Sequence, residues 1–133
     1  MQQVSVFIEN TSGTLTDVLK SIKNAGIQLY AISIADTSEY GICRIICDDP
    51  QKAFDTLRAS GFAASVSEVI ALSIGDAPGD ASDSISLFAE AGVSIAYLYS
   101  FLLNGKPVLA FRTDDKEKAM NIVEKNGLTI AEL

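Results

Sequence analysis

Apolar residues first recur at every second position and then at a helical spacing. The alternating positions, typical of a strand with one buried face, are Val4, Val6 and Ile8. The helical spacing of i, i+3, i+4 and i+7 follows at Leu15, Val18, Leu19 and Ile22. For this helix we predict Thr14 as the N-cap, Asp17 as its capping-box partner and Gly26 as the residue that ends it.

The next residues predict two strands, a second helix and a last strand. The strands extend from about 28 to 36 and from 42 to 47, with a turn between Ser38 and Gly41. Asp49 is the predicted cap of the second helix, because Pro50 suits a first turn, and Gly61 ends it. A strand over 63–66 then leads almost directly into Val69, where a new strand begins.

The second half of the chain repeats the first at an offset of 66 residues without a gap. Identities fall on turn and core positions, and include Ile8 with Ile74, Gly13 with Gly79, Ala25-Gly26 with Ala91-Gly92, Asp48-Asp49 with Asp114-Asp115, and Gly61 with Gly127. In the second copy we predict a capping box of Asp114 and Glu117. The sequence therefore predicts an α+β fold of two tandem ferredoxin-like βαββαβ modules, residues 1–67 and 68–133, with antiparallel sheets and helices on one face.

The second strand of each copy is apolar on both faces. Strict alternation assigns Leu29 and Ala31 to one face and Tyr30, Ile32 and Ile34 to the other. In the second copy it separates Ile95, Tyr97, Tyr99 and Phe101 from Ala96, Leu98 and Leu102. Because strands covered on one side only should alternate apolar with polar residues, we expect a sheet of a second chain to cover the face away from the helices. This predicts a homodimer.

Composition narrows the function classes. The net charge of −7 disfavours binding to nucleic acid or to an anionic membrane, and no apolar stretch is long enough to cross a bilayer. The N-terminus lacks the features of a signal peptide, so we expect a cytoplasmic protein. With no histidine in the chain, Ser-His-Asp and Cys-His catalysis are excluded, and we expect no catalytic residue, cofactor or metal site.

The two cysteines are predicted to be buried, reduced thiols. Cys43 and Cys47 lie on one strand, which separates their Cα atoms by about 13 Å at roughly 3.3 Å per residue. A disulfide needs a separation below about 7 Å. The adjacent acidic pairs at the helix starts are interpreted as caps rather than metal ligands.

Two segments resemble the ACT domains, small βαββαβ modules that bind amino acids and regulate metabolic enzymes. Residues 6–18 are similar to the family's opening of an apolar strand, Asn, x-x-Gly, x-Leu and x-x-Val, and residues 24–29 to its second hallmark. The second copy repeats both more weakly over 75–79 and 91–95. It departs from the pattern with Asp76 in place of Asn10 and Ala81 in place of Leu15, and an aspartate would repel a ligand carboxylate.

The resemblance implies an amino-acid site at an interface between two modules, at the turn between the first strand and first helix. There, unpaired N–H groups of a helix N-terminus favour a carboxylate, and the Asn10 amide can both accept and donate hydrogen bonds. The alternative is that these residues only build a tight turn, and that the tyrosines only cover the sheet. The candidate ligand-binding residues are Asn10, Thr11, Ser12, Gly13, Thr14, Leu15, Tyr40, Asp76, Pro78, Gly79 and Tyr99.

Two functions remain open from the sequence. One is a regulatory protein that senses a free amino acid without catalysis. The other is a subunit that docks an amino-acid biosynthetic enzyme through its exposed sheet without binding a ligand. Acylphosphatases share this element order but need an arginine in the first turn, and none precedes Arg44. Metal carriers of this fold need Cys-x-x-Cys in that turn, which is missing here. RNA-binding modules of this topology need a basic and aromatic third strand, and the net charge of −7 opposes that function.

Overall fold

The protein folds into two compact units with the same order of elements. A computed structural model describes residues 1–9, 11–36 and 40–133. The first unit spans Gln2–Glu68, and the second comprises Val69–Leu133 together with Met1. Met1 and Val69 exchange two backbone hydrogen bonds, with N···O distances of 2.9 and 3.2 Å. The structure thus divides the chain between Glu68 and Val69.

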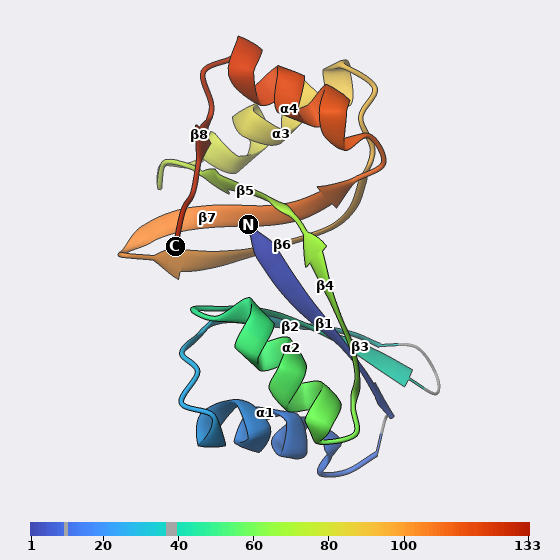
Figure 1. The fold of residues 1–133 in the computed structure, drawn as a ribbon. Coiled ribbons are helices and arrows are strands. Elements are labelled where there is room, and N and C mark those ends of the chain that lie inside the picture. Colours follow the sequence, from blue (N-terminus) through green and yellow to red (C-terminus); the bar gives the residue numbers. More distant parts are fainter. Residues whose placement is uncertain (10, 37–39) are drawn as a thin grey trace. The chain divides into compact units, whose positions relative to one another are not determined.

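The first unit is a four-stranded antiparallel sheet with two helices on one face (Figure 1). Its elements are β1 (Gln2–Glu9), α1 (Thr14–Asn24), β2 (Leu29–Asp36), β3 (Tyr40–Cys47), α2 (Pro50–Ala59) and β4 (Ala63–Glu68). The strands lie in the order β2-β3-β1-β4. The central strands are therefore β3 and β1, and the edge strands are β2 and β4.

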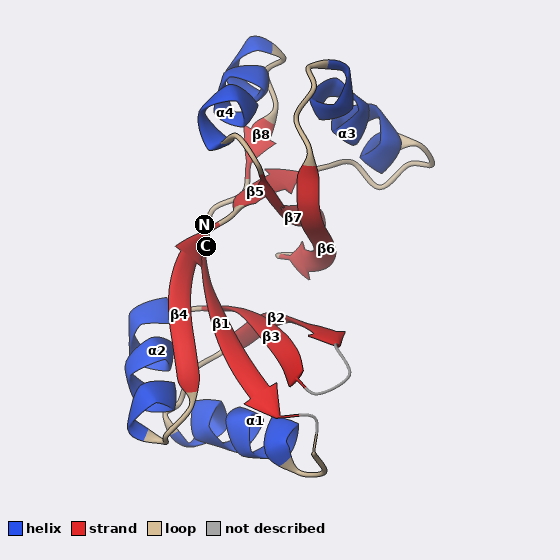
Figure 2. Cartoon of the chain, turned by 90° about the vertical axis from the view of Figure 1, so that its right-hand side faces the viewer, coloured by secondary structure: helices blue, strands red, loops and turns tan. Residues whose placement is uncertain are grey.

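The second unit repeats this architecture. Its elements are β5 (Ile70–Ser73), α3 (Asp80–Glu90), β6 (Ile95–Leu103), β7 (Lys106–Thr113), α4 (Lys116–Lys125) and β8 (Thr129–Ile130). The strand order β6-β7-β5-β8 corresponds strand for strand to the first unit. In each unit both helices cover the same side of the sheet (Figure 2). The predicted fold class, two tandem ferredoxin-like modules with helices on one face, is confirmed.

The apolar residues of both the strand pattern and the helix pattern form the core of each unit. In the first unit, the buried side chains of β1 pack against those of the two helices; the cluster includes Val4, Val6, Ile8, Val18, Ile22, Ala53 and Leu57. The corresponding cluster of the second unit includes Ile70, Leu72, Phe88, Phe111, Ala119 and Val123. Each unit therefore has its own core between its helices and its sheet.

The ends of the helices agree with the sequence at the C-terminus and differ at the N-terminus. Gly26 follows α1 with a φ of 72°, and Gly61 and Gly127 follow α2 and α4 with φ of 89° and 63°. These left-handed glycines confirm the predicted helix ends. The predicted N-cap Thr14 is wrong: the N-cap is Gly13, and Thr14 is the first helical residue.

The two carboxylates of each acidic pair make different hydrogen bonds. The N-cap carboxylates of α2 and α4 belong to Asp49 and Asp115, which accept from the N–H groups of Lys52 and Lys118 at 3.0 Å. The predicted capping box of Asp114 is therefore wrong. The first aspartate of each pair instead binds the backbone just before the second strand of its unit. Asp48 accepts from the N–H of Gln28 and Asp114 from that of Ser94, both at 3.0 Å.

A bulge at the same place in both units corrects the predicted strand faces. The register shifts between Leu29 and Ala31 in β2, and between Ile95 and Tyr97 in β6. A bulge adds one residue and so reverses the alternation beyond it. Leu29 and Ile95 consequently pack against the helix-side cores, whereas strict alternation grouped them with Ala31 and Tyr97.

The second strand of each unit is an edge strand with exposed apolar side chains. In the register of β2, Ile32 and Ile34 lie opposite Ile45 and Cys43 on the helix side, yet they are exposed. Leu98 in β6 is exposed in the same way. On the opposite face Phe7 is 57% exposed. Of these residues, only Phe7 lies on the face away from the helices, which a second chain was expected to cover, and that expectation stays a prediction.

Candidate functional site

The predicted site in the first unit is an exposed turn between β1 and α1. Asn10, the residue on which the predicted amino-acid recognition mainly depends, lies outside the described residues. The Thr11 N–H donates to the Glu9 carbonyl at 2.8 Å, and the Thr11 and Thr14 hydroxyl oxygens lie 2.7 Å apart in a hydrogen bond. Thr11, Ser12 and Gly13 are all exposed to solvent.

Gly13 gives this turn an open helix N-terminus. Its φ of 89° is a left-handed value that glycine adopts without strain. As a glycine, the N-cap has no side chain to accept from the first-turn N–H groups, in contrast to Asp49 at α2. The helix dipole adds partial positive charge at this end. The turn can therefore attract a carboxylate.

A hollow of about 360 Å³ lies beside the turn. It is lined by residues of β1, the start of α1 and the α2–β4 turn: Phe7, Ile8, Glu9, Thr14, Gly61, Phe62 and Ala63. Glu9 and Phe7 are exposed, so an anionic and an apolar side chain are both available here. Sequence reasoning missed these residues, although their position directly before the turn could have indicated them.

Two other predicted residues lie near this turn. Tyr40 begins β3 opposite Glu9 in the register, and its side chain is 51% exposed. Leu15 is half-buried and packs against the core of the first unit. The structure therefore places Tyr40 at the same end of the sheet as the turn, whereas Leu15 anchors α1 to the core.

In the second unit the predicted residues lie apart. Asp76, Pro78 and Gly79 form an exposed turn before α3, and Gly79 is its N-cap with a φ of 92°. Tyr99 lies in the middle of β6, opposite Ala110 of β7, and β5 is the next strand beyond. Tyr99 is two inter-strand spacings of roughly 4.8 Å from β5, which is about 10 Å. Within this unit, Tyr99 is not brought to the turn.

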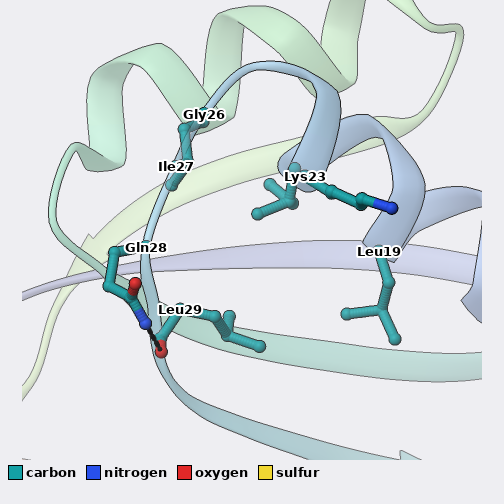
Figure 3. Close-up of a pocket in the computed structure, with 7 residues that line it drawn as sticks. Leu19, Lys23, Gly26, Ile27, Gln28 and Leu29 are labelled. Carbon is teal, nitrogen blue, oxygen red and sulfur yellow. Dashed lines mark hydrogen bonds between the residues drawn. The ribbon is translucent and has the colours of Figure 1, made fainter.

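The second hallmark segment lies at the opposite end of α1. A hollow of about 430 Å³ there is lined by Leu19, Ile22, Lys23, Gly26, Ile27, Gln28 and Leu29. Figure 3 shows Leu19 and Lys23 projecting from α1, while the Gln28 side chain donates to the Leu29 carbonyl at 3.1 Å. Since α1 has 11 residues at about 1.5 Å each, roughly 16 Å separate the two hallmarks.

The thiols have no features of a nucleophile. Burial raises the pKa of the Cys43 thiol to about 11. Burial also raises the pKa of Cys47, and the charges of Asp48 and Asp49 add to this rise, although a backbone hydrogen bond at Asp49 opposes it. Both cysteines are free and buried, as predicted. A thiol with a raised pKa stays protonated at neutral pH and reacts slowly.

Among the described residues, no group of three or more acidic or cysteine side chains is placed to hold a metal ion. No helix in the described part of the chain has the length and apolar character needed to cross a membrane.

Comparison with known proteins identifies the family. The chain is similar to a protein of Bacteroides thetaiotaomicron whose crystal structure superposes with a TM-score of 0.91 at 31% identity, over 98% of this chain and 90% of that chain. It also resembles the regulatory subunit of aspartate kinase from Thermus thermophilus in its ligand-free form, with a TM-score of 0.65 at 17% identity, over 93% of this chain and 91% of that one.

A further likeness, to the regulatory subunit of aspartate kinase from Thermus flavus, has a TM-score of 0.61 at 16% identity, over 93% of this chain and 90% of that chain. At this identity, the two aspartate kinase subunits support the fold alone. Comparison with curated protein sequences finds no match. The family model described as "ACT domain pair" matches residues 1–132, and the chain therefore belongs to the ACT domain pair family.

Proposed function

We propose that this protein is a cytoplasmic regulatory protein that binds a free amino acid at the β1–α1 turn of its first unit and catalyses no reaction. The observation that carries the proposal is the open N-terminus of α1 at Gly13, beside the hollow formed with Glu9 and Phe7. Membership of the ACT domain pair family supports the regulatory role. The binding residues are those of the turn, from Asn10 to Leu15, together with Tyr40.

The chemistry of this hollow matches the two charges of an amino acid. N–H groups in the first turn of α1 bind the carboxylate, helped by the helix dipole. The exposed Glu9 carboxylate binds the ammonium group, since the two opposite charges are a short distance apart in every amino acid. Phe7 and Phe62 offer apolar surface to the side chain of the ligand.

We propose further that a second copy of the chain completes this site, as a homodimer. The two hallmark segments lie at opposite ends of α1, and about 16 Å is longer than a free amino acid can span. A ligand that contacts both kinds of segment must therefore lie between two units, and we propose that the second of these belongs to another copy of the chain. The exposed apolar side chains of β2 and β6 support such an association.

A second candidate function rests on the same exposed sheet. Phe7 and Tyr40 are 57% and 51% exposed, which suits contact with a protein surface. In this alternative the chain is a subunit that docks an amino-acid biosynthetic enzyme and binds no ligand itself. The resemblance to regulatory subunits of aspartate kinase suggests this class of partner.

A thermal-shift screen of the twenty amino acids separates the two functions. We expect at least one amino acid to raise the Tm, because a ligand that binds only the folded state stabilises it by about 2.7 kcal/mol at 100 times its Kd. Each amino acid should be compared with its amide, which lacks the carboxylate and should give no shift. If no amino acid raises the Tm, the sensor function is wrong and the docking function is favoured.

A further inference from the structure

We propose that Asp80 closes the turn of the second unit with its own carboxylate, so that only the first unit accepts the carboxylate of a ligand. The inference rests on the proposed function in one respect, that the β1–α1 turn of the first unit binds the ligand carboxylate. The closure of the turn before α3 by Asp80 depends only on contacts within the second unit. It makes the two units unequal and predicts one ligand per chain.

The backbones of the two turns are closely alike. The glycine N-caps have φ of 89° at Gly13 and 92° at Gly79. Each glycine carbonyl accepts the N–H four residues on, from Asp17 at 3.0 Å and from Asp83 at 2.8 Å. The difference between the turns therefore lies in their side chains.

The side chain at the first helical position differs in chemistry. In the first unit this residue is Thr14, whose hydroxyl is hydrogen-bonded to the hydroxyl of Thr11. In the second unit it is Asp80, whose carboxylate oxygen Oδ2 accepts from the Ala77 N–H at 2.9 Å. A negative charge already occupies the N-terminal turn of α3, where a helix favours an anion.

Gly75 leaves room for this placement. A Cβ atom added at Gly75 would overlap the end of the Asp80 side chain, which would then have to shift. The corresponding residue of the first unit is Glu9, and Thr14 corresponds to Asp80. The first unit therefore lacks the combination of Gly75 and Asp80.

The neighbouring charges strengthen the effect. Asp76 lies in the turn, and Asp83 joins Asp80 in the first turn of α3. In the first unit Asp17 lies in the first turn of α1, and Glu9 lines the hollow beside the turn. An incoming carboxylate would therefore meet three negative charges at the α3 turn and two at the α1 turn.

The test uses sodium acetate as the carboxylate probe on the isotope-labelled full chain, followed by amide NMR, with sodium chloride at equal ionic strength as the control. In the wild type we expect acetate to shift the amides of residues 12–15 and to leave those of 79–81 in place. D76N/D80T gives the second unit the corresponding residues of the first at these two positions, and acetate should then shift the amides of residues 79–81.

The reverse exchange keeps the inference testable if that variant does not fold. E9G/T14D installs the pair of the second unit in the first and should abolish the acetate shifts that the wild type shows at residues 12–15. Wild-type shifts at residues 79–81 as large as those at 12–15 would overturn the inference. So would an unmoved α3 turn in D76N/D80T.

The result is separable from the proposed function. If no amino acid binds the wild type but acetate shifts the amides of residues 79–81 only in D76N/D80T, the proposed function is wrong and the closure by Asp80 stands. If an amino acid binds with two sites per chain, the proposed function stands and the closure is wrong.

Discussion

Phe88→Ala is expected to lower the free energy of unfolding by about 3–5 kcal/mol, enough to remove most of the stability of a small domain. Phe88 is fully buried under α3, and its ring meets that of Phe111 edge to face, with centroids 5.2 Å apart. Truncation removes both the buried apolar surface and this ring pair, and leaves a cavity between α3 and β7. Urea unfolding followed by circular dichroism measures the loss.

The control for this variant is Leu102→Ala in the same unit. Leu102 is 67% exposed, so its truncation should change the free energy of unfolding by no more than about 0.5 kcal/mol. A loss below about 1 kcal/mol for Phe88→Ala would contradict the core described for the second unit.

Gly13→Ala is expected to weaken amino-acid binding by about tenfold, equivalent to about 1.4 kcal/mol. A Cβ at Gly13 would meet no atom within 4 Å, so the cost arises only from the left-handed φ of 89°. A non-glycine residue there is strained by about 1–2 kcal/mol, and relief of this strain moves the N–H groups that bind the carboxylate. Calorimetric titration with an amino acid found in the thermal-shift screen measures the change.

Gly79→Ala is the matched control, because Gly79 has a φ of 92° and equally free surroundings. Both variants should lose about the same unfolding free energy, roughly 1–2 kcal/mol, whereas only Gly13→Ala should lose affinity. Equal losses of affinity in both variants would contradict a binding site confined to the first unit.

Much of the fold could be predicted because a duplicated chain shows the same pattern twice. The alternation at Val4, Val6 and Ile8 and the glycines after the helices marked element types and ends, since both follow from local backbone geometry. The helix starts were harder: Thr14 with Asp17 matches a capping box, but a glycine in the left-handed conformation takes the N-cap position instead. The recurrence of glycine at positions 13 and 79 was the signal available for this.

The remaining differences depend on contacts that no local pattern encodes. The bulges at the starts of β2 and β6 come from pairing with neighbouring strands, and they change which face Leu29 and Ile95 occupy. The hydrogen bond from the Ala77 N–H to the Asp80 carboxylate lies within a turn and leaves no periodic trace in the sequence. For the candidate site, the position of the turn was predictable, but the adjoining Phe7 and Glu9 depended on the path of β1 beside it.

The most direct test of the central claim is an amide NMR titration of the isotope-labelled full chain with each of the twenty amino acids. The account predicts that at least one of them shifts the amides of residues 11–15 saturably and leaves those of residues 79–81 in place. If no amino acid shifts the amides of residues 11–15, the β1–α1 turn of the first unit is not an amino-acid site and the proposed function is wrong.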